Sequence, residues 1–301
     1  MPVYNGENYI AEAIDSLLKQ TFEDFELIIA DNASIDGTEE ICRSYARRDT
    51  RVRYVRNKTN IGAAKNCNLL VKISSGEYFK WAAHDDICAP DYLSRCVGIL
   101  DRDPSVVLCH TQTAYVDDDG ALLEADEATG AFIDRHGCHW GVDTAKRMGS
   151  MKASERFEDF LLRTVNIFEI FGLIRRNFLE KTPLFRRYYA ADRALLAELI
   201  LLGRFFEVPE RLFFRRCHRE QASQQSMQRR ADVIDPAKPE VVRLTGWRNF
   251  AGYMRVLHKV SLNPIERVRC YIALVRLVFL RRTLRKILLP GPYNYFGIDK
   301  R

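Results

Sequence analysis

The chain has 301 residues, 47% hydrophobic and 29% charged, a balance typical of a globular protein with one large domain or two modest ones. Its net charge of +6 is uneven: residues 226–301 hold 16 Lys and Arg against 5 Asp and Glu, whereas residues 1–225 hold 30 against 35. The eight cysteines form no CxxC pair, which argues against a structural zinc site and favours a reducing compartment. With no signal peptide at its start, we expect a cytoplasmic protein.

Helices and short apolar strands alternate along the first 110 residues. The spacing of apolar residues predicts helices at 8–20, 36–48, 60–74 and 90–100. Short apolar runs predict strands at 25–31, 52–55, 79–85 and 106–110. This alternation is typical of the α/β class, with a mostly parallel sheet and crossover helices.

Polar residues follow the predicted strands, at Asp31-Asn32, at 57–60 and at His84-Asp85-Asp86. The carboxyl ends of parallel strands form the edge of a sheet where ligands bind. The sequence has no GxGxxG or P-loop motif, so phosphates would be held by a cation, basic side chains or helix N-termini. The adjacent carboxylates of Asp85 and Asp86 suit a hard divalent ion. Alternatively, they form a solvated acidic turn that caps the next helix.

The second half of the chain is less regular. An Asp-rich turn at 117–120 predicts a hairpin, and the residues at 130–149 predict a mobile loop. Beyond them we expect a helix at 155–165 and a second helix within 184–202 that begins near Asp192. We also expect strands at 168–174, 205–208 and 211–216, the last two joined by a turn at Pro209. Asp192 falls in the first turn of the second helix, where an acid serves either the helix dipole or catalysis.

The basic C-terminal part is predicted to be helical, after a linker at 235–239. Residues 270–289 are apolar but carry five Arg and Lys, which argues against a membrane-spanning helix. Two interpretations remain: an amphipathic helix on an anionic membrane surface, or a helical cap packed on the domain. No nucleic-acid-binding module surrounds the basic residues, so we expect no nucleic acid partner.

Four motifs in order resemble the inverting family 2 glycosyltransferases, which have the GT-A fold. They are Pro2-Val3-Tyr4-Asn5, Asp31-Asn32-Ala33-Ser34-Ile35-Asp36-Gly37-Thr38, Asn60-Ile61-Gly62 and Asp85-Asp86. The resemblance covers about residues 1–225. It implies a nucleotide-sugar-binding half at 1–110, an acceptor half at 111–225 and a basic helical extension at 226–301.

The resemblance also implies roles for single residues around the donor nucleotide. It places four residues beside the nucleobase: Pro2, Val3, Tyr4 and Glu7. Asp31 would accept a hydrogen bond from the base, which favours a UDP- or dTDP-sugar. Lys65 stands near a position where the family often has an arginine beside the base and phosphates.

Around the reacting groups, the resemblance implies that Asp85 binds Mg²⁺ or Mn²⁺ at the donor diphosphate, with His218 completing metal or diphosphate binding. The family's acid near the ribose is replaced by His84 or Ala83, which leaves Asp86 as a helper. Asp192 matches the base that takes the acceptor's proton. The reaction implied is sugar transfer to a hydroxyl of a glycan or lipid-linked acceptor, in cell-surface polysaccharide synthesis at the cytoplasmic membrane face.

Two departures from the family keep another function open. Met1 stands where members usually have a full apolar strand, and the acid before Asp85 is altered. These features motivate the alternative of a non-catalytic nucleotide-sugar-binding subunit or a degenerate transferase. A nucleotidyltransferase fits less well, because Asn5-Gly6-Glu7-Asn8 does not supply the Gly-rich basic loop that it would need.

Overall fold

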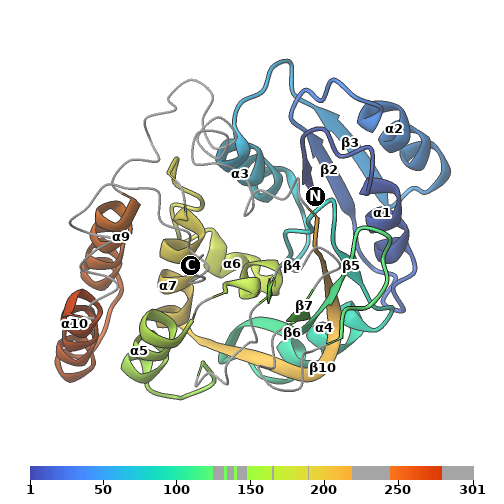
Figure 1. The fold of residues 1–301 in the computed structure, drawn as a ribbon. Helices are drawn as coiled ribbons and strands as arrows, with labels where there is room; N and C mark the ends of the chain where they lie inside the picture. The colour runs from blue at the N-terminus through green and yellow to red at the C-terminus, as the bar shows by residue number, and fades with distance from the viewer. Residues whose placement is uncertain are drawn as a thin grey trace.

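A computed structural model of the chain describes residues 1–124, 132–133, 139–140, 148–164, 166–188, 190–218 and 245–279. Two sheets and their covering helices form one side of the molecule, and a layer of helices forms the other (Figure 1). The α/β class expected from the sequence is confirmed.

The N-terminal sheet is parallel and has the order β1-β2-β3. Its strands are β1 (Pro2–Val3), β2 (Leu27–Asp31) and β3 (Val52–Arg56). They alternate with the helices α1 (Ile10–Leu18), α2 (Thr38–Arg48) and α3 (Ala63–Ile73). All five residues of β2 are buried, as expected for a strand with neighbours on both sides and helices on both faces. The predicted elements of this region are confirmed to within a few residues.

The second sheet has the order β4-β9-β6-β10-β5. Its strands are β4 (Tyr78–Phe79), β5 (Ile87–Cys88), β6 (Val106–Val116), β9 (Leu173–Arg175) and β10 (Arg204–Arg216). The long central pair β6 and β10 is parallel, and the remaining pairs are antiparallel. Helix α4 (Tyr92–Arg102) packs on β6 and β10. A separate hairpin pairs β7 (Phe132–Ile133) with β8 (His139–Trp140).

Two strand predictions in this region are wrong, and the turn predicted at Pro209 does not form. The run at 79–85 is a strand only to Phe79; beyond it, Lys80 Nζ donates to the carbonyl of Phe171, and Trp81 Nε1 donates to that of Cys67 at 3.1 Å. At 168–174 the chain forms the 3₁₀ helix η1 (Phe168–Phe171) and then β9. Residues 205–208 and 211–216 belong to one strand, β10, in which shifts of register around Pro209 absorb the proline.

The helical layer contains α5 (Ala153–Arg163), α7 (Ala191–Leu202), α9 (Thr245–Lys259) and α10 (Pro264–Phe279). The short helix α6 (Arg176–Leu179) links it to β9. Each of the four long helices contacts two others, and their inward faces join one hydrophobic core. The prediction of a helical cap is therefore confirmed for α9 and α10, although α10 begins six residues before the predicted start at Cys270. Within the described residues, no helix is long and apolar enough to cross a membrane.

The two remaining expectations concern loops. The hairpin turn at 117–120 is confirmed: the amide of Asp117 donates to the carbonyl of Ala121 at 2.9 Å, and Gly120 has a φ of +85°, which favours glycine. Most of the loop predicted at 130–149, the linker at 235–239 and residues 280–289 lie outside the described residues.

Candidate active site

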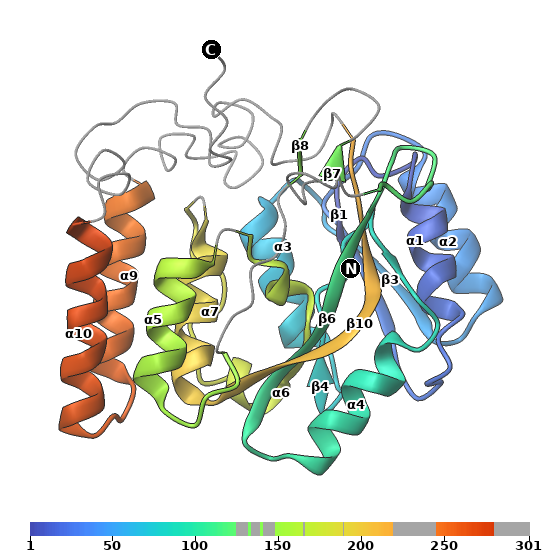
Figure 2. The same cartoon turned by 60° about the horizontal axis from the view of Figure 1, so that its bottom comes forward.

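The carboxyl ends of β6 and β10 and the first turn of α7 lie on the same side of the molecule (Figure 2). This arrangement follows from the topology. Helix α7 ends at Leu202 and β10 begins at Arg204, so the helix returns the chain to the opposite end of the strands. The predicted ligand-binding edge therefore collects residues from distant parts of the sequence.

Two loops at this edge are joined by hydrogen bonds, the loop after β1 (residues 4–9) and the loop after β2 (residues 32–37). The Asn5 amide donates to Ser34 Oγ at 2.9 Å, and the Gly6 amide donates to Thr38 Oγ1 at 2.8 Å. In return, the Glu7 carboxylate accepts the Gly37 amide at 2.6 Å. These contacts hold the motif at residues 2–5 against the motif at residues 31–38. They also leave Tyr4 39% exposed, with its ring accessible.

Asp31 is fully buried at the end of β2. Its Oδ1 accepts the Ser34 amide at 2.8 Å, and its Oδ2 accepts hydrogen bonds from Tyr54 and Arg56, both at 2.6 Å. Burial alone would raise the pKa of Asp31, but these hydrogen bonds outweigh it and hold the pKa below its usual value. The carboxylate is thus ionised and already bound by three protein groups, a constraint that the sequence did not indicate.

A network of asparagine side chains ties the next loop to this edge. Asn32 Nδ2 donates to Asn60 Oδ1 at 2.7 Å, and Asn57 Nδ2 donates to Asn66 Oδ1 at 2.9 Å. Asn66 is buried and donates to the carbonyl of Ala30 at 2.7 Å. The amides therefore hold the N-terminal end of α3 beside the end of β2. Lys65 lies in the first turn of that helix with an exposed side chain.

Among the residues that the structure describes, four non-glycine residues have positive φ values: Asn5 (53°), Ala33 (65°), Leu184 (56°) and Ala190 (60°). Two of them lie in the joined loops after β1 and β2, and two lie in the segment that leads into α7. Left-handed backbone costs free energy for a residue with a Cβ atom, and such residues cluster at functional sites. Only Asn5 is a residue type that could have been flagged from the sequence.

Asp85, Asp86 and His218 meet where the segment before β5 passes the end of β10. The imidazole Nε2 of His218 lies 3.0 Å from Oδ2 of Asp85, and its Nδ1 is buried without a hydrogen-bond partner among the described residues. Burial would raise the pKa of Asp85, but the charges of His84 and His218 outweigh it and hold the pKa well below the usual range. For Asp86, burial and the charge of Asp85 both raise the pKa. Asp85 is therefore the readily ionised member of the pair, and Asp86 is not.

Arg216, at the end of β10, organises this corner. It is 1% exposed, and its backbone amide donates to Asp86 Oδ1 at 3.0 Å. Its guanidinium donates to the carbonyl of Asp85 at 3.0 Å, to the carbonyls of Asp117 and Asp118 at 3.1 and 2.9 Å, and to Glu12 on α1. Nothing in the sequence pairs this arginine with those partners, because they lie 98 to 204 residues away.

Two further contacts complete the corner. The ring of Tyr9 lies 4.7 Å from the ring of His218, and the Arg216 guanidinium lies over the same tyrosine at 5.0 Å. Gly6 lies against the ring of His84, since a Cβ atom built on Gly6 would stand 2.7 Å from His84 Cδ2. Val3, which is buried, would meet that Cβ at the same distance. The altered acid position, His84, is therefore in contact with the loop after β1.

Asp192 lies in the first turn of α7, as predicted, and is half-buried. Its Oδ1 accepts the amide of Arg193 at 2.8 Å. Burial raises its pKa. Burial also raises the pKa of the Cys67 thiol on α3 to about 12, and the charge of Asp192 adds to that rise. Trp81 donates to the carbonyl of Cys67, so α3 is in contact with the segment that leads to Asp85.

The donor set around Asp85 fits a divalent cation. A carboxylate oxygen suits Mg²⁺ or Mn²⁺, and an imidazole nitrogen, Nε2 of His218, lies 3.0 Å from it; a cation held by both would replace the hydrogen bond between them. No cluster of three or more His, Cys, Asp or Glu side chains occurs among the residues that the structure describes. Phosphate oxygens and water would therefore have to complete the coordination.

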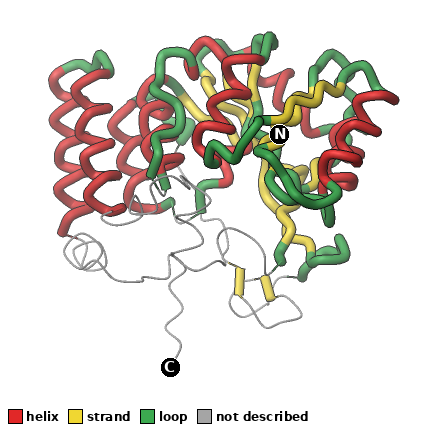
Figure 3. Tube along the Cα trace, turned by 90° about the horizontal axis from the view of Figure 1, so that it is seen from above, coloured by secondary structure: helices red, strands yellow, loops and turns green. Residues whose placement is uncertain are grey.

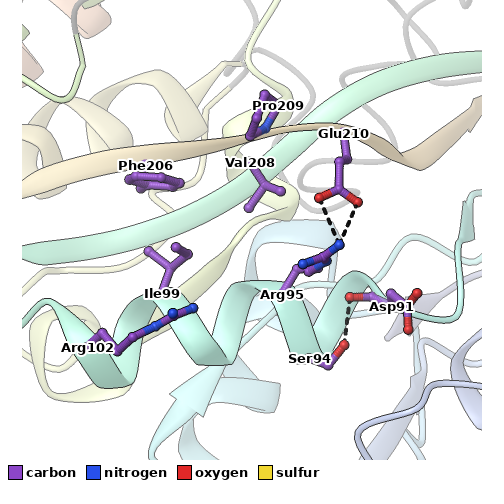
Figure 4. Close-up of a pocket in the computed structure, with 9 residues that line it drawn as sticks. All are labelled: Asp91, Ser94, Arg95, Ile99, Arg102, Phe206, Val208, Pro209 and Glu210. Carbon is purple, nitrogen blue, oxygen red and sulfur yellow. Dashed lines mark hydrogen bonds and ion pairs between the residues drawn. The ribbon is translucent and has the colours of Figure 1, made fainter.

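A cavity elsewhere on the surface does not involve these residues. It has a volume of about 500 Å³ and lies between α4 and β10, where Arg95 and Glu210 form an ion pair at 3.2 Å (Figure 4). None of the residues predicted to bind donor or metal lines it.

Comparisons with known proteins show the family and the fold of this chain. Residues 1–179 match the family described as "Glycosyl transferase family 2". An uncharacterised glycosyltransferase of Haemophilus influenzae is 25% identical over 267 residues, which cover 88% of this chain and 78% of that protein. A chondroitin synthase of Escherichia coli is 27% identical over 172 residues, covering 57% of this chain and 23% of that protein.

Two solved structures share the fold. TarS 1–349 of S. aureus in complex with UDP has a TM-score of 0.63 at 17% identity, covering 94% of this chain and 72% of that one. The mannosyltransferase PcManGT of Pyrobaculum calidifontis, solved with GDP-Man and Mn²⁺, has a TM-score of 0.59 at 18% identity, covering 95% and 71%. The fold is therefore GT-A. Other matches are shorter: 20% of a Rickettsia felis relative and 31% of a Rickettsia prowazekii relative are covered.

Proposed function

The chain belongs to glycosyl transferase family 2, and from that premise we propose that it is an inverting, metal-assisted glycosyltransferase. It would move a sugar from a nucleotide-diphosphate sugar to a hydroxyl of a glycan or lipid-linked acceptor, in cell-surface polysaccharide synthesis at the inner face of the cell membrane. The observation that carries the proposal is the contact between Asp85 and His218 at 3.0 Å, at the same edge as the joined loops after β1 and β2.

The nucleotide would lie over these two loops, in the half of the domain formed by residues 1–110. Tyr4 is exposed enough to stack on a base, bordered by Pro2, Val3 and Glu7. Asp31 is ionised, and a carboxylate with three donors retains acceptor capacity for the ring N–H of uracil or thymine. Because Asp31 is buried, only the edge of the base that carries the ring N–H could approach the carboxylate. Lys65, with its exposed ammonium, would add positive charge near the phosphates.

Asp85 and His218 would hold Mg²⁺ or Mn²⁺, with Asp86 and His84 beside them. A bound divalent ion would offset the charge that grows on the leaving diphosphate. Asp86 accepts a hydrogen bond from the backbone amide of Arg216, so Asp86 would fix the end of β10 relative to Asp85. The fit of this donor set, together with the Mn²⁺ in the PcManGT structure, supports a divalent cation in this chain.

Asp192 would act as the base on the acceptor side, in the half formed by residues 111–225. It would take the proton of the acceptor hydroxyl while that oxygen bonds to the anomeric carbon and the bond to the diphosphate breaks. Attack from the face opposite the leaving group inverts the anomeric configuration. A carboxylate whose pKa is raised by burial is a stronger base, which suits this task.

Release of nucleoside diphosphate from a panel of UDP-, dTDP- and GDP-sugars, with and without Mn²⁺, tests the proposal. We expect Mn²⁺-dependent turnover with at least one donor, strongly reduced in Asp192→Asn. Donor binding without any turnover would contradict it and favour a non-catalytic nucleotide-sugar-binding subunit.

A further inference from the structure

Helices α9 and α10 form the outer edge of the helical layer, at the left of Figure 3. Helix α10 carries a row of exposed apolar side chains, here called the stripe. The stripe is formed by Ile265, Val268, Ile272, Val275 and Phe279, each between 48 and 71% exposed. Large apolar side chains scattered singly are ordinary on a protein surface, whereas a contiguous row of five marks an interaction site.

The stripe is separate from the helix face that holds α10 in the fold. Cys270, Ala273 and Leu274 are buried in the main core, and α10 contacts α5 and α9. Packing against the domain therefore accounts for the buried apolar residues on one side of α10. It does not account for the exposed apolar residues on the other side. In Figure 1, α10 lies at the edge of the molecule farthest from the N-terminal sheet, so among the described elements nothing covers the stripe.

Basic residues lie along one flank of the stripe. Helices α9 and α10 together carry six Lys or Arg and one acid, Glu266. Arg269 and Arg276 stand beside the stripe with side chains 54 and 62% exposed, each paired with one acid, Glu266 and Glu158 respectively. Four more basic residues follow within 281–286 of the sequence. An apolar face with a basic border is complementary to an anionic lipid surface.

The same charges oppose pairing with a second copy of the chain. The stripe repeats at intervals of three and four residues, as in a coiled coil, which puts Arg269 and Arg276 at equivalent flanking positions. An antiparallel pair would bring these arginines together. A parallel pair would place Arg276 against Tyr271 and Arg269 against Pro264, with no acid in reach.

We propose that the exposed face of α10 binds the surface of an anionic lipid bilayer, with the stripe buried among the headgroups and Arg269 and Arg276 at the phosphates. The helix would lie along the surface and would not cross it. This inference rests on the proposed location at the cell membrane and deepens it, but it does not require sugar transfer, because lipid binding needs no donor.

Co-sedimentation of the full chain with vesicles tests it. One set contains phosphatidylcholine alone, and the other contains phosphatidylcholine with phosphatidylglycerol. We expect about tenfold more bound protein with the anionic vesicles, falling as salt is raised. The double variant Ile272→Gln/Val275→Gln should lose this binding. The matched control, Leu122→Gln/Met151→Gln, removes two apolar side chains of similar exposure elsewhere and should bind like the unmodified chain.

Three results would overturn the proposal. The first is equal recovery in the supernatant with and without anionic vesicles. The second is unchanged binding of the stripe variant. The third is a concentration-dependent dimer in vesicle-free buffer that the stripe substitutions abolish, since the face would then join two copies of the chain. The replaced side chains are exposed, so unchanged circular dichroism and melting temperature should accompany the loss of binding. Donor turnover without vesicles is a separate readout, and its absence would count only against the transferase.

Discussion

The imidazole Nε2 of His218 lies 3.0 Å from Oδ2 of Asp85, although 133 positions separate the two residues in the chain. The contact exists because β10 runs parallel to β6 and ends beside the segment that precedes β5. It brings together the two side chains that the sequence assigned to a metal. Arg216 holds the two aspartates beside this contact. Its amide donates to Asp86, and its guanidinium donates to the carbonyl of Asp85.

The catalytic role of Asp192 is tested by Asp192→Asn, which keeps the size and the hydrogen-bond acceptor but removes the base. We expect nucleoside diphosphate release in the presence of acceptor to fall by about 10²- to 10⁴-fold, because general bases contribute about that much. Binding of donor should change little. Asp24→Asn, at an exposed acid remote from this edge in the sequence, is the matched control and should keep full activity. Full activity in Asp192→Asn would exclude it as the base.

The same substitution should stabilise the folded protein at neutral pH. Burial raises the pKa of Asp192 in the folded state, so stability is lost as pH rises from the unfolded value through the folded one. Asparagine does not ionise and escapes this loss. Urea unfolding should therefore give Asp192→Asn a higher free energy of unfolding at pH 7, with the gain vanishing at a pH below the usual aspartate pKa. A variant that is less stable at pH 7 would contradict the raised pKa.

Arg216→Ala should destabilise the fold strongly. The arginine is 1% exposed, and its removal takes the guanidinium donor from the carbonyls of Asp85 and Asp118, whereas the carbonyl of Asp117 keeps the Gly120 amide. Losing one partner of a buried charged network costs about 3–5 kcal/mol. Since Glu12 is half exposed, we expect the lower end of that range.

Arg211→Ala is the control for that measurement, because it removes an exposed arginine from the same strand. Its free energy of unfolding should stay within about 0.5 kcal/mol of the unmodified chain. Equal effects of the two substitutions in urea denaturation would show that Arg216 has no special structural role.

Gly6→Ala should disturb the loop after β1. The new Cβ would stand 2.7 Å from both His84 Cδ2 and Val3 Cγ2, too close for ordinary contact. Overpacking of this kind costs about 1–3 kcal/mol. Because Gly6 also donates to Thr38, we expect weaker donor binding together with lower thermal stability. Gly149→Ala is the control, since its Cβ would meet only the carbonyl of Phe205 at 3.6 Å. No difference between the two variants would contradict the close approach.

The sequence predicted the alternation of helices and strands in the first 110 residues because periodic apolar positions report burial directly. It failed at 80–85, where an apolar run passes through the core without ladder pairing, held by Lys80 and Trp81 instead. A short apolar run has no periodicity that separates a strand from a buried irregular segment. For the same reason, the apolar run at 168–171 cannot be told from a strand by its sequence, although it forms the 3₁₀ helix η1.

The candidate site was predictable only as a set of single residues. Asp31, Asp85, Asp192 and His218 were chosen through the family resemblance, and the structure adds what surrounds each of them. The partners of Asp31, namely Tyr54 and Arg56, follow from the register of β2 against β3 and from no local pattern. Arg216 was missed because its role depends on carbonyl groups, which every residue has.

Calorimetric titration of UDP into the unmodified chain and into Asp85→Asn, with Mn²⁺ and with EDTA, measures whether Asp85 anchors a cation for the diphosphate. We expect binding that needs Mn²⁺ in the unmodified chain and is weakened by about tenfold or more in Asp85→Asn. Binding of equal strength in EDTA, or in Asp85→Asn with Mn²⁺, would contradict the claim that this carboxylate anchors a cation for a nucleoside diphosphate.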